Sequence, residues 1–150
     1  MLGIFEGSVG VGCALLREGE GEGEEGGDEA GKGGEKFGII STGDIWKEVL
    51  SQAVRGEVLG AEKVGRVFAG VETCGLDAGE LHGDGEVEGR VKDAAKRLVG
   101  VEGVGVVVLG CAGMVGMEGW VREVVGGEVR VVDGVKAGVG VLQGLCRGGF

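Results

Sequence analysis

The stretch Val104-Gly105-Val106-Val107-Val108-Leu109-Gly110-Cys111-Ala112-Gly113-Met114 decides the fold. Its β-branched apolar run predicts a strand buried on both faces, and the run stops at a glycine, a cysteine and two small residues. A helical pattern follows at residues 114–125, so the thiol of Cys111 is expected between the end of a strand and the start of a helix. In open α/β sheets, ligands bind outside the carboxyl ends of the strands.

The position of Cys111 has two interpretations. The free amides and the dipole at a helix N-terminus stabilise anions, which favours a reactive thiolate. Free cysteines are also among the most buried residue types, so a small core side chain is the alternative. The local pattern by itself leaves both interpretations open.

The order of strand, polar turn and helix occurs four times along the chain. Strands are predicted at residues 36–40, 64–71, 104–109 and 129–132, and helices at residues 44–54, 87–99, 114–125 and 135–145. A short strand at residues 2–5 and a helix at residues 8–17, capped by Ser8, precede them. This alternation predicts an α/β fold in which helices flank a parallel sheet.

The helix at residues 44–54 has a distinct polar and apolar pattern. Asp44 is expected to cap it, and Lys47 and Glu48 are expected to face solvent. One face is expected to carry the apolar residues Ile45, Trp46, Val49, Leu50 and Val54.

Polar or reactive residues follow each predicted strand, and parallel strands end at one edge of a sheet. They are Ser41-Thr42-Gly43, Thr73-Cys74, Cys111 and Asp133. Hydroxyls and helix N-terminal amides around a thiol suit a small anionic or amide-bearing ligand. Capping of the next helix is the alternative role for any one of these residues, but for the set together we expect a binding site.

Composition excludes several classes of function. The 150 residues include 38 glycines and no proline, so G-x-G matches arise by chance and do not indicate a nucleotide-binding loop. A net charge of −10 without a basic stripe argues against nucleic-acid binding. Four widely spaced cysteines and a single histidine argue against a metal site.

Residues 18–36 alternate glycine and glutamate and carry eight acidic residues and two lysines, a net charge of −6. With no apolar residue except Ala30, this stretch is expected to be a disordered surface insertion, with an acidic interaction segment as the alternative. No secretory signal is visible, and the longest uncharged stretch, residues 103–117, is shorter than a membrane span. We therefore expect a soluble cytoplasmic protein with reduced thiols and no membrane partner.

Five segments together resemble the Asp/Glu/hydantoin racemase family, in particular its hydantoin and allantoin racemase branch and related fungal proteins. They occur in the family's order and cover nearly all of the chain outside residues 18–36. The segments are Gly3-Ile4-Phe5-Glu6-Gly7-Ser8, Phe37-Gly38-Ile39-Ile40-Ser41-Thr42-Gly43 with Trp46, Glu72-Thr73-Cys74-Gly75-Leu76, Leu109-Gly110-Cys111-Ala112-Gly113-Met114 and Asp133-Gly134-Val135.

The resemblance implies a cofactor-independent racemase, an isomerase that uses two cysteines as acid and base on opposite faces of a small substrate. That substrate would be a hydantoin, allantoin or an amino-acid derivative. Cys111 corresponds to the second catalytic cysteine. The substrate-binding residues implied are Ser41, Thr42, Gly43, Thr73, Ala112 and Gly113, with the amides of the last two stabilising the enolate-like charge.

The family's first cysteine lies in a motif upstream of the segment that opens this chain, so the resemblance implies a truncated member. Residues 1–17 would be a remnant of the N-terminal lobe, residues 37–134 the C-terminal lobe, and residues 135–150 a helix that returns toward the missing lobe. Of the remaining cysteines, Cys13 and Cys146 do not resemble the lost partner. Cys74 lies closer to the right edge, but the family has a small residue there.

Three functions follow from this comparison of motifs. The first is racemase chemistry impaired by the absent cysteine, the second an inactive family member or small-ligand binding module, and the third a decarboxylase-like reaction with a single cysteine. Because the last helix would leave an apolar face uncovered, we also expect the chain to aggregate, form a homo-oligomer such as a dimer, or unfold easily.

Overall fold

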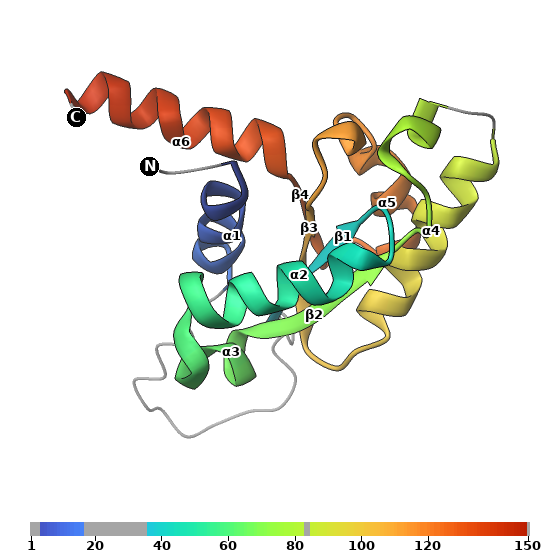
Figure 1. The fold of residues 1–150 in the computed structure, drawn as a ribbon, viewed down its shortest axis with the longest axis horizontal. Coiled ribbons are helices and arrows are strands. Elements are labelled where there is room, and N and C mark those ends of the chain that lie inside the picture. Colours follow the sequence, from blue (N-terminus) through green and yellow to red (C-terminus); the bar gives the residue numbers. More distant parts are fainter. Residues whose placement is uncertain (1–3, 17–35, 83–84, 150) are drawn as a thin grey trace.

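The structure, a computed structural model, describes residues 4–16, 36–82 and 85–149. In these residues one sheet is flanked by helices on both faces, which confirms the α/β fold (Figure 1). The strands are β1 (Lys36–Ser41), β2 (Phe68–Thr73), β3 (Val104–Leu109) and β4 (Arg130–Asp133). The α-helices are α1 (Ile4–Ala14), α2 (Ile45–Ala53), α3 (Gly60–Val67), α4 (Glu86–Val99), α5 (Glu118–Val125) and α6 (Gly134–Gly148). Shorter segments are the π-helical η1 (Val54–Val58) and the 3-10 turns η2 (Ala78–His82) and η3 (Ala112–Met114).

The strands are all parallel and lie in the order β2-β1-β3-β4. Ser41 of β1 lies opposite Thr73 of β2. Leu109 of β3 lies opposite Ile40 on one side and Asp133 of β4 on the other. The four strands therefore end at the same edge of the sheet, which we call the carboxyl edge.

The core forms one layer on each face of the sheet because side chains alternate along the central strands. Val108 of β3 packs in the same cluster as Val9 of α1 and Leu50 of α2. Its neighbour Val107 packs on the opposite face with Leu98 of α4. Gly38 of β1 allows α4 to approach closely, since a Cβ there would lie 2.5 Å from a methyl group of Leu98. The continuous apolar run in β3 is thus explained by burial on both faces.

The structure corrects the expectation for the first residues. The pattern predicts a strand at residues 2–5 and a helix capped by Ser8, but α1 already includes residues 4 and 5. Ser8 is buried inside this helix and is not its cap. A four-residue apolar run fits either structure, and packing of Val9 against the sheet favours the helix here. Residues 2 and 3 and Arg17 lie outside the described residues.

Two further boundaries differ from the prediction. The strand expected at residues 64–71 begins only at Phe68, where pairing with Phe37 of β1 starts, and residues 64–67 end α3. The helix expected at residues 114–125 begins at Glu118, because Gly116 has a φ of +84° that interrupts a helix. The predicted helices at 44–54, 87–99 and 135–145 and the strand at 129–132 are confirmed, with ends that differ by no more than three residues.

The apolar face expected on α2 is only partly buried. Leu50 and the following Val54 lie in the core, whereas Ile45, Trp46 and Val49 are exposed by 74%, 45% and 47%. Only the side of the helix that carries Leu50 meets the sheet. The glycine- and glutamate-rich stretch at 18–36 lies outside the described residues, apart from Lys36, which begins β1. No helix in the described part of the chain is long and apolar enough to span a membrane.

Candidate functional site

The carboxyl edge brings the predicted site residues together. Ser41 ends β1, and Thr42 and Gly43 follow it. Thr73 ends β2, and Cys111 lies two residues after the end of β3. Backbone hydrogen bonds continue past the strands and join these loops. The amide of Cys74 donates to the Ser41 carbonyl (3.0 Å), that of Gly75 to the Thr42 carbonyl (3.1 Å) and that of Gly110 to the Ile40 carbonyl (2.8 Å).

Cys111 is partly buried, and its backbone is extended before the turn η3. Its carbonyl accepts a hydrogen bond from the amide of Met114 (3.0 Å), which closes the turn. Gly113 lies beside the thiol, since a Cβ at that glycine would be 3.8 Å from Sγ of Cys111. The regular helix expected directly after Cys111 is absent, because α5 begins at Glu118 and only the short turn η3 follows the thiol.

The hydroxyls of Ser41 and Thr42 are not engaged by the fold. Both residues are almost fully buried, at 2% and 1% exposure. Within the described residues neither hydroxyl has a hydrogen-bond partner, although both backbone carbonyls are engaged. Among the described residues, neither hydroxyl oxygen is a fully enclosed atom without a partner, so both keep contact with the surface and can pair with a ligand or water.

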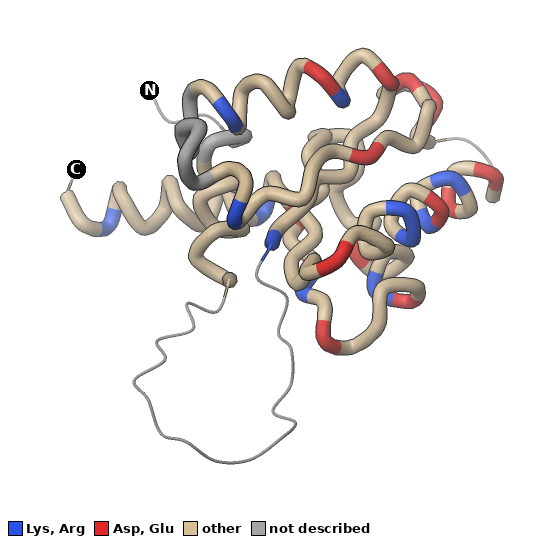
Figure 2. Tube along the Cα trace, turned by 90° about the horizontal axis from the view of Figure 1, so that it is seen from below, with Lys and Arg blue, Asp and Glu red and all other residues tan. Residues whose placement is uncertain are grey.

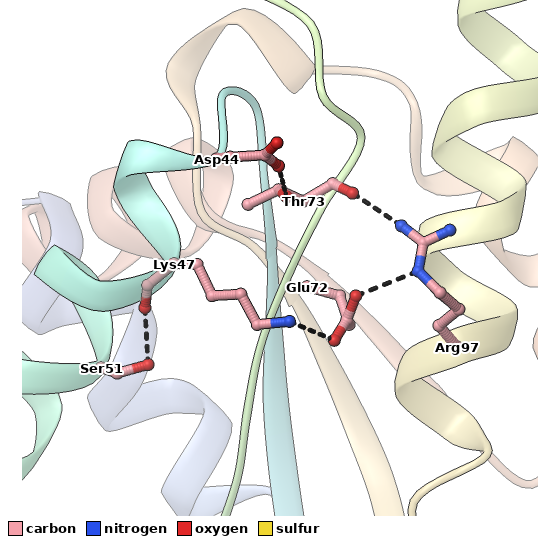
Figure 3. Close-up of polar contacts among 6 residues, drawn as sticks. All are labelled: Asp44, Lys47, Ser51, Glu72, Thr73 and Arg97. Atoms are coloured by element: carbon pink, nitrogen blue, oxygen red, sulfur yellow. Dashed lines mark hydrogen bonds and ion pairs between the residues drawn. The ribbon is translucent and has the colours of Figure 1, made fainter.

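Thr73 is engaged on two sides (Figure 3). Its hydroxyl donates a short hydrogen bond to Oδ1 of Asp44, and its carbonyl accepts one from Nη2 of Arg97 (2.8 Å). Asp44 does occupy the N-cap position of α2, but its carboxylate makes no capping hydrogen bond. The prediction that Asp44 caps this helix through its side chain is therefore wrong, because the carboxylate turns to Thr73.

The neighbouring residue Glu72 joins two helices across β2 (Figure 3). Its two carboxylate oxygens accept hydrogen bonds from Nζ of Lys47 on α2 (2.8 Å) and Nε of Arg97 on α4 (3.0 Å). Burial raises the pKa of Glu72, but the hydrogen bonds and charges of Lys47 and Arg97 outweigh it, so the pKa lies below its ordinary value. Lys47 faces solvent as expected and in addition forms an ion pair with Glu72.

Asp133 caps α6 and also holds the loop that follows Cys111. One carboxylate oxygen accepts from the amides of Val135 and Lys136 (both 3.0 Å), and the other accepts from the amide of Gly116 (3.1 Å). Burial raises the pKa of Asp133, but these backbone donors outweigh it and hold the pKa below its usual range. Capping, the alternative role considered for this residue, is thus its observed one.

The other cysteines differ in position. Cys74 lies buried at the carboxyl edge with its Sγ 3.9 Å from the Thr42 carbonyl, and burial raises the pKa of its thiol. Cys13 lies in α1, and Cys146 is exposed on α6. Cys111 is therefore the partly exposed thiol of the carboxyl edge.

Sequence reasoning missed the connection between β2 and α4. Leu76 and Asp77 approach Gly43, because a Cβ on that glycine would be 3.6 Å from Oδ1 of Asp77 and 3.8 Å from the carbonyl of Leu76. Leu81 of η2 reaches Gly113, where a Cβ would be 2.8 Å from its Cδ1. This connection therefore borders the carboxyl edge from Gly43 to the Cys111 turn.

It also missed an ion pair beside Asp133. Lys136 of α6 pairs with Glu118 of α5, and this hydrogen bond lowers the pKa of Glu118. No local sequence signal connects these two positions, which are brought together by the placement of α5 and α6.

Charged residues are spread along most of the elements that Figure 2 draws.

An open cleft of about 400 Å³ lies at the start of β4, away from the carboxyl edge. It is lined by Arg122, Gly126, Gly127, Val129, Arg130 and Val131. It includes none of the predicted site residues. In the part of the chain that the structure describes, no group of three or more His, Cys, Asp or Glu residues is arranged to hold a metal ion.

Comparison with known proteins gives consistent results. A family model described as Asp/Glu/Hydantoin racemase matches residues 21–142. An uncharacterized protein from Schizosaccharomyces pombe is 32% identical over 116 residues, which cover 76% of this chain and 47% of that protein.

Solved racemase structures share the fold. The allantoin racemase from Pseudomonas fluorescens has a TM-score of 0.73 at 24% identity, covering 98% of this chain and 52% of that one. The allantoin racemase from Klebsiella pneumoniae gives 0.71 at 21% identity, covering 99% and 51%. A glutamate racemase from Bacillus anthracis gives 0.60 at 16% identity, covering 99% and 49%. The chain thus spans about half the length of each of these proteins.

Proposed function

The chain belongs to the Asp/Glu/hydantoin racemase family, and we propose that its carboxyl edge binds a small carbonyl compound on which Cys111 transfers a proton. The observation that carries the proposal is the position of this thiol. Cys111 is partly exposed at the same edge as Ser41 and Thr42, two buried residues whose hydroxyls have no hydrogen-bond partner among the described residues. Such a setting combines a candidate acid and base with polar groups that hold a ligand.

The proposed chemistry needs no redox partner. The thiolate of Cys111 takes the proton from the stereogenic carbon, and the electron pair of the C–H bond moves into the adjacent carbonyl to give an enolate. When the enolate collapses, the thiol returns a proton to the carbon and becomes a thiolate again. The substrate class we propose is a hydantoin, allantoin or a related amino-acid derivative.

The turn after Cys111 can stabilise the enolate. In the described residues the amides of Ala112 and Gly113 donate no backbone hydrogen bond to another loop, and they open the turn η3 beside the thiol. Amide donors aimed at a developing oxyanion are a common source of catalytic stabilisation. Gly43, beside Ser41 and Thr42, would complete the ligand contacts through its backbone.

Racemisation requires proton transfer on both faces of the carbon, and Cys111 accounts for one face. Cys74 is a poor second base because burial raises the pKa of its thiol and its Sγ faces the Thr42 carbonyl. With Cys111 alone, we expect exchange of the substrate proton with solvent to be faster than loss of optical purity.

The test is deuterium exchange at the stereogenic carbon of a chiral hydantoin in D₂O, followed by proton NMR and by chiral chromatography. Cys111→Ser should abolish exchange above the protein-free background, whereas Cys146→Ser, which removes the exposed thiol on α6, should leave it unchanged. Binding of the hydantoin without exchange in the unmodified protein would refute proton transfer and support the small-ligand binding module.

Decarboxylation is the remaining alternative, and the same assay can be run with a matching α-carboxylated substrate. Release of carbon dioxide that depends on Cys111, without exchange on the hydantoin, would favour this reaction. If Cys111→Ser exchanges deuterium at an unchanged rate, Cys111 does not transfer the proton and the proposal is refuted.

A further inference from the structure

We propose that Lys47, Glu72 and Arg97 are positioning residues that fix the ligand-binding loop Ser41–Thr42 through the end of β2. The proposal rests on the proposed function for the role of that loop. In this proposal none of the three side chains contacts the substrate. They act on the loop through Thr73, which is a positioning residue as well.

Glu72 lies near the end of β2. Among the described residues β2 is an edge strand of the sheet, with β1 as its neighbour. The carboxylate of Glu72 accepts hydrogen bonds from Lys47 on α2 (2.8 Å) and from Arg97 on α4 (3.0 Å). Because α2 and α4 pack on opposite faces of the sheet, these two ion pairs fasten the strand from both sides (Figure 3).

Thr73 is oriented by hydrogen bonds to both its carbonyl and its hydroxyl. Arg97 uses a second nitrogen, Nη2, to bond the Thr73 carbonyl (2.8 Å), while the Thr73 hydroxyl donates to Asp44 at the start of α2. The planar guanidinium presents several donors in a fixed geometry. Arg97 alone can therefore fix the positions of both the Glu72 carboxylate and the Thr73 carbonyl. Because the Thr73 hydroxyl already donates its proton to Asp44, a positioning role for Thr73 is favoured over direct binding of the substrate.

Backbone hydrogen bonds join the end of β2 to the ligand-binding loop. The next two residues, Cys74 and Gly75, donate their amides to the carbonyls of Ser41 and Thr42 (3.0 and 3.1 Å). Their position therefore sets the position of the two unengaged hydroxyls. Displacement of catalytic or binding groups by about 1 Å can reduce a rate by roughly 100-fold.

The exposure of these ion pairs argues against a purely stabilising role. The side chains of Lys47 and Arg97 are both more than half exposed. Exposed ion pairs contribute little to folding stability, because water and salt screen them. Removal of these ion pairs should therefore reduce order at the end of β2 without a large decrease in the free energy of unfolding.

The experiment compares Arg97→Gln and Glu72→Gln with Lys96→Gln as the matched control. Lys96 lies next to Arg97 on α4, and its ion-pair partner among the described residues is Asp93 in the same helix. The first measurement, which does not depend on activity, is the rate at which each cysteine of the folded protein is alkylated, resolved by peptide mass spectrometry. Cys74 should react at least fivefold faster in the two test variants, with unchanged rates at the exposed Cys146 and in Lys96→Gln.

The second measurement is the kinetics of deuterium exchange on the chiral hydantoin. Both test variants should lower kcat/KM by about tenfold or more. Arg97→Lys should recover part of this loss, since an ammonium group can reach Glu72 or the Thr73 carbonyl but not both. Melting curves accompany each variant, and Arg97→Lys replaces Arg97→Gln if the latter does not fold.

The outcomes separate the two proposals. If the unmodified protein shows no exchange but Cys74 responds as expected, the proposed function fails and the positioning of β2 stands. If exchange occurs in the unmodified protein and Cys74 is alkylated at the same rate in all variants, the positioning proposal is overturned. It is also overturned if Cys74 reacts faster while kcat/KM stays unchanged.

Discussion

Gly134 lies directly against the carbonyl oxygen of Leu109, so that a Cβ at position 134 would come within 2.5 Å of it. Ser8 of α1 lies on the same side, with its Cβ 3.4 Å from that position. Helix α6 therefore starts in contact with the end of β3, two residues before Cys111. Because the obstructing atom belongs to the backbone, no side-chain rotation can make room.

Gly134→Ala should consequently destabilise the protein by about 1–3 kcal/mol, the usual range for overpacking. Gly140→Ala in the same helix is the control, since a Cβ there has no atom within 4 Å. It should stabilise the protein by roughly 0.5–1 kcal/mol, because alanine favours a helix over glycine. Urea unfolding measures both, and equal effects would contradict the close contact.

Asp133→Ala should lower the free energy of unfolding by about 1–3 kcal/mol, since it removes a helix cap and the acceptor for Gly116. The loop that follows Cys111 should loosen as well, which hydrogen exchange at Gly116 can detect. Asp93→Asn is a suitable control, because the side-chain contact of Asp93 among the described residues is an exposed ion pair within α4. A stable variant with a protected Gly116 amide would contradict this role.

The stabilisation by Asp133 should also depend on pH. Its pKa is lower in the folded protein than in the unfolded chain, so its contribution is complete above the unfolded value of about 3.9. It is lost as the pH falls through the lower, folded pKa. The stability difference between the natural protein and Asp133→Asn should be constant from pH 5 to about pH 8 and shrink below about pH 4. A difference that persists undiminished at pH 2 would refute the assignment.

Leu81 and Gly113 should be energetically coupled because they meet between the β2–α4 connection and the Cys111 turn. Gly113→Ala alone forces Leu81 aside, and Leu81→Ala alone leaves a cavity. In the double variant each change relieves the other, so the cost should be smaller than the sum by about 1 kcal/mol. Leu50→Ala, on the other face of the sheet, should be additive with Gly113→Ala.

The exposed apolar side chains of α6 predict self-association. Val139, Leu142 and Leu145 are each about 40% exposed on this helix. Contiguous apolar surface of this kind favours contact between copies of a chain. Light scattering after size exclusion should show species larger than the monomer at high protein concentration, and Leu142→Glu with Leu145→Glu should reduce them. A monomer at every concentration would refute this prediction.

The elements that the sequence predicted correctly are those with a long and unambiguous pattern. The apolar run of β3 and the helix at 87–99 need no distant partner to be recognised, because burial on two faces and a 3.6-residue period are both local properties. The boundaries of β2 and α1 were not predictable in this way. Phe68 begins a strand because it pairs with Phe37, a residue 31 positions earlier.

The candidate site divides along the same line. The sequence alone determined that Ser41, Thr73, Cys111 and Asp133 end or follow parallel strands and so share one edge. Only the tertiary structure decided what each does there. The hydroxyls of Ser41 and Thr42 have no hydrogen-bond partner in the described part of the chain, whereas Thr73 is held by Asp44 and Arg97. These differences depend on strand register and on the placement of helices, which are set by packing between residues far apart in the chain.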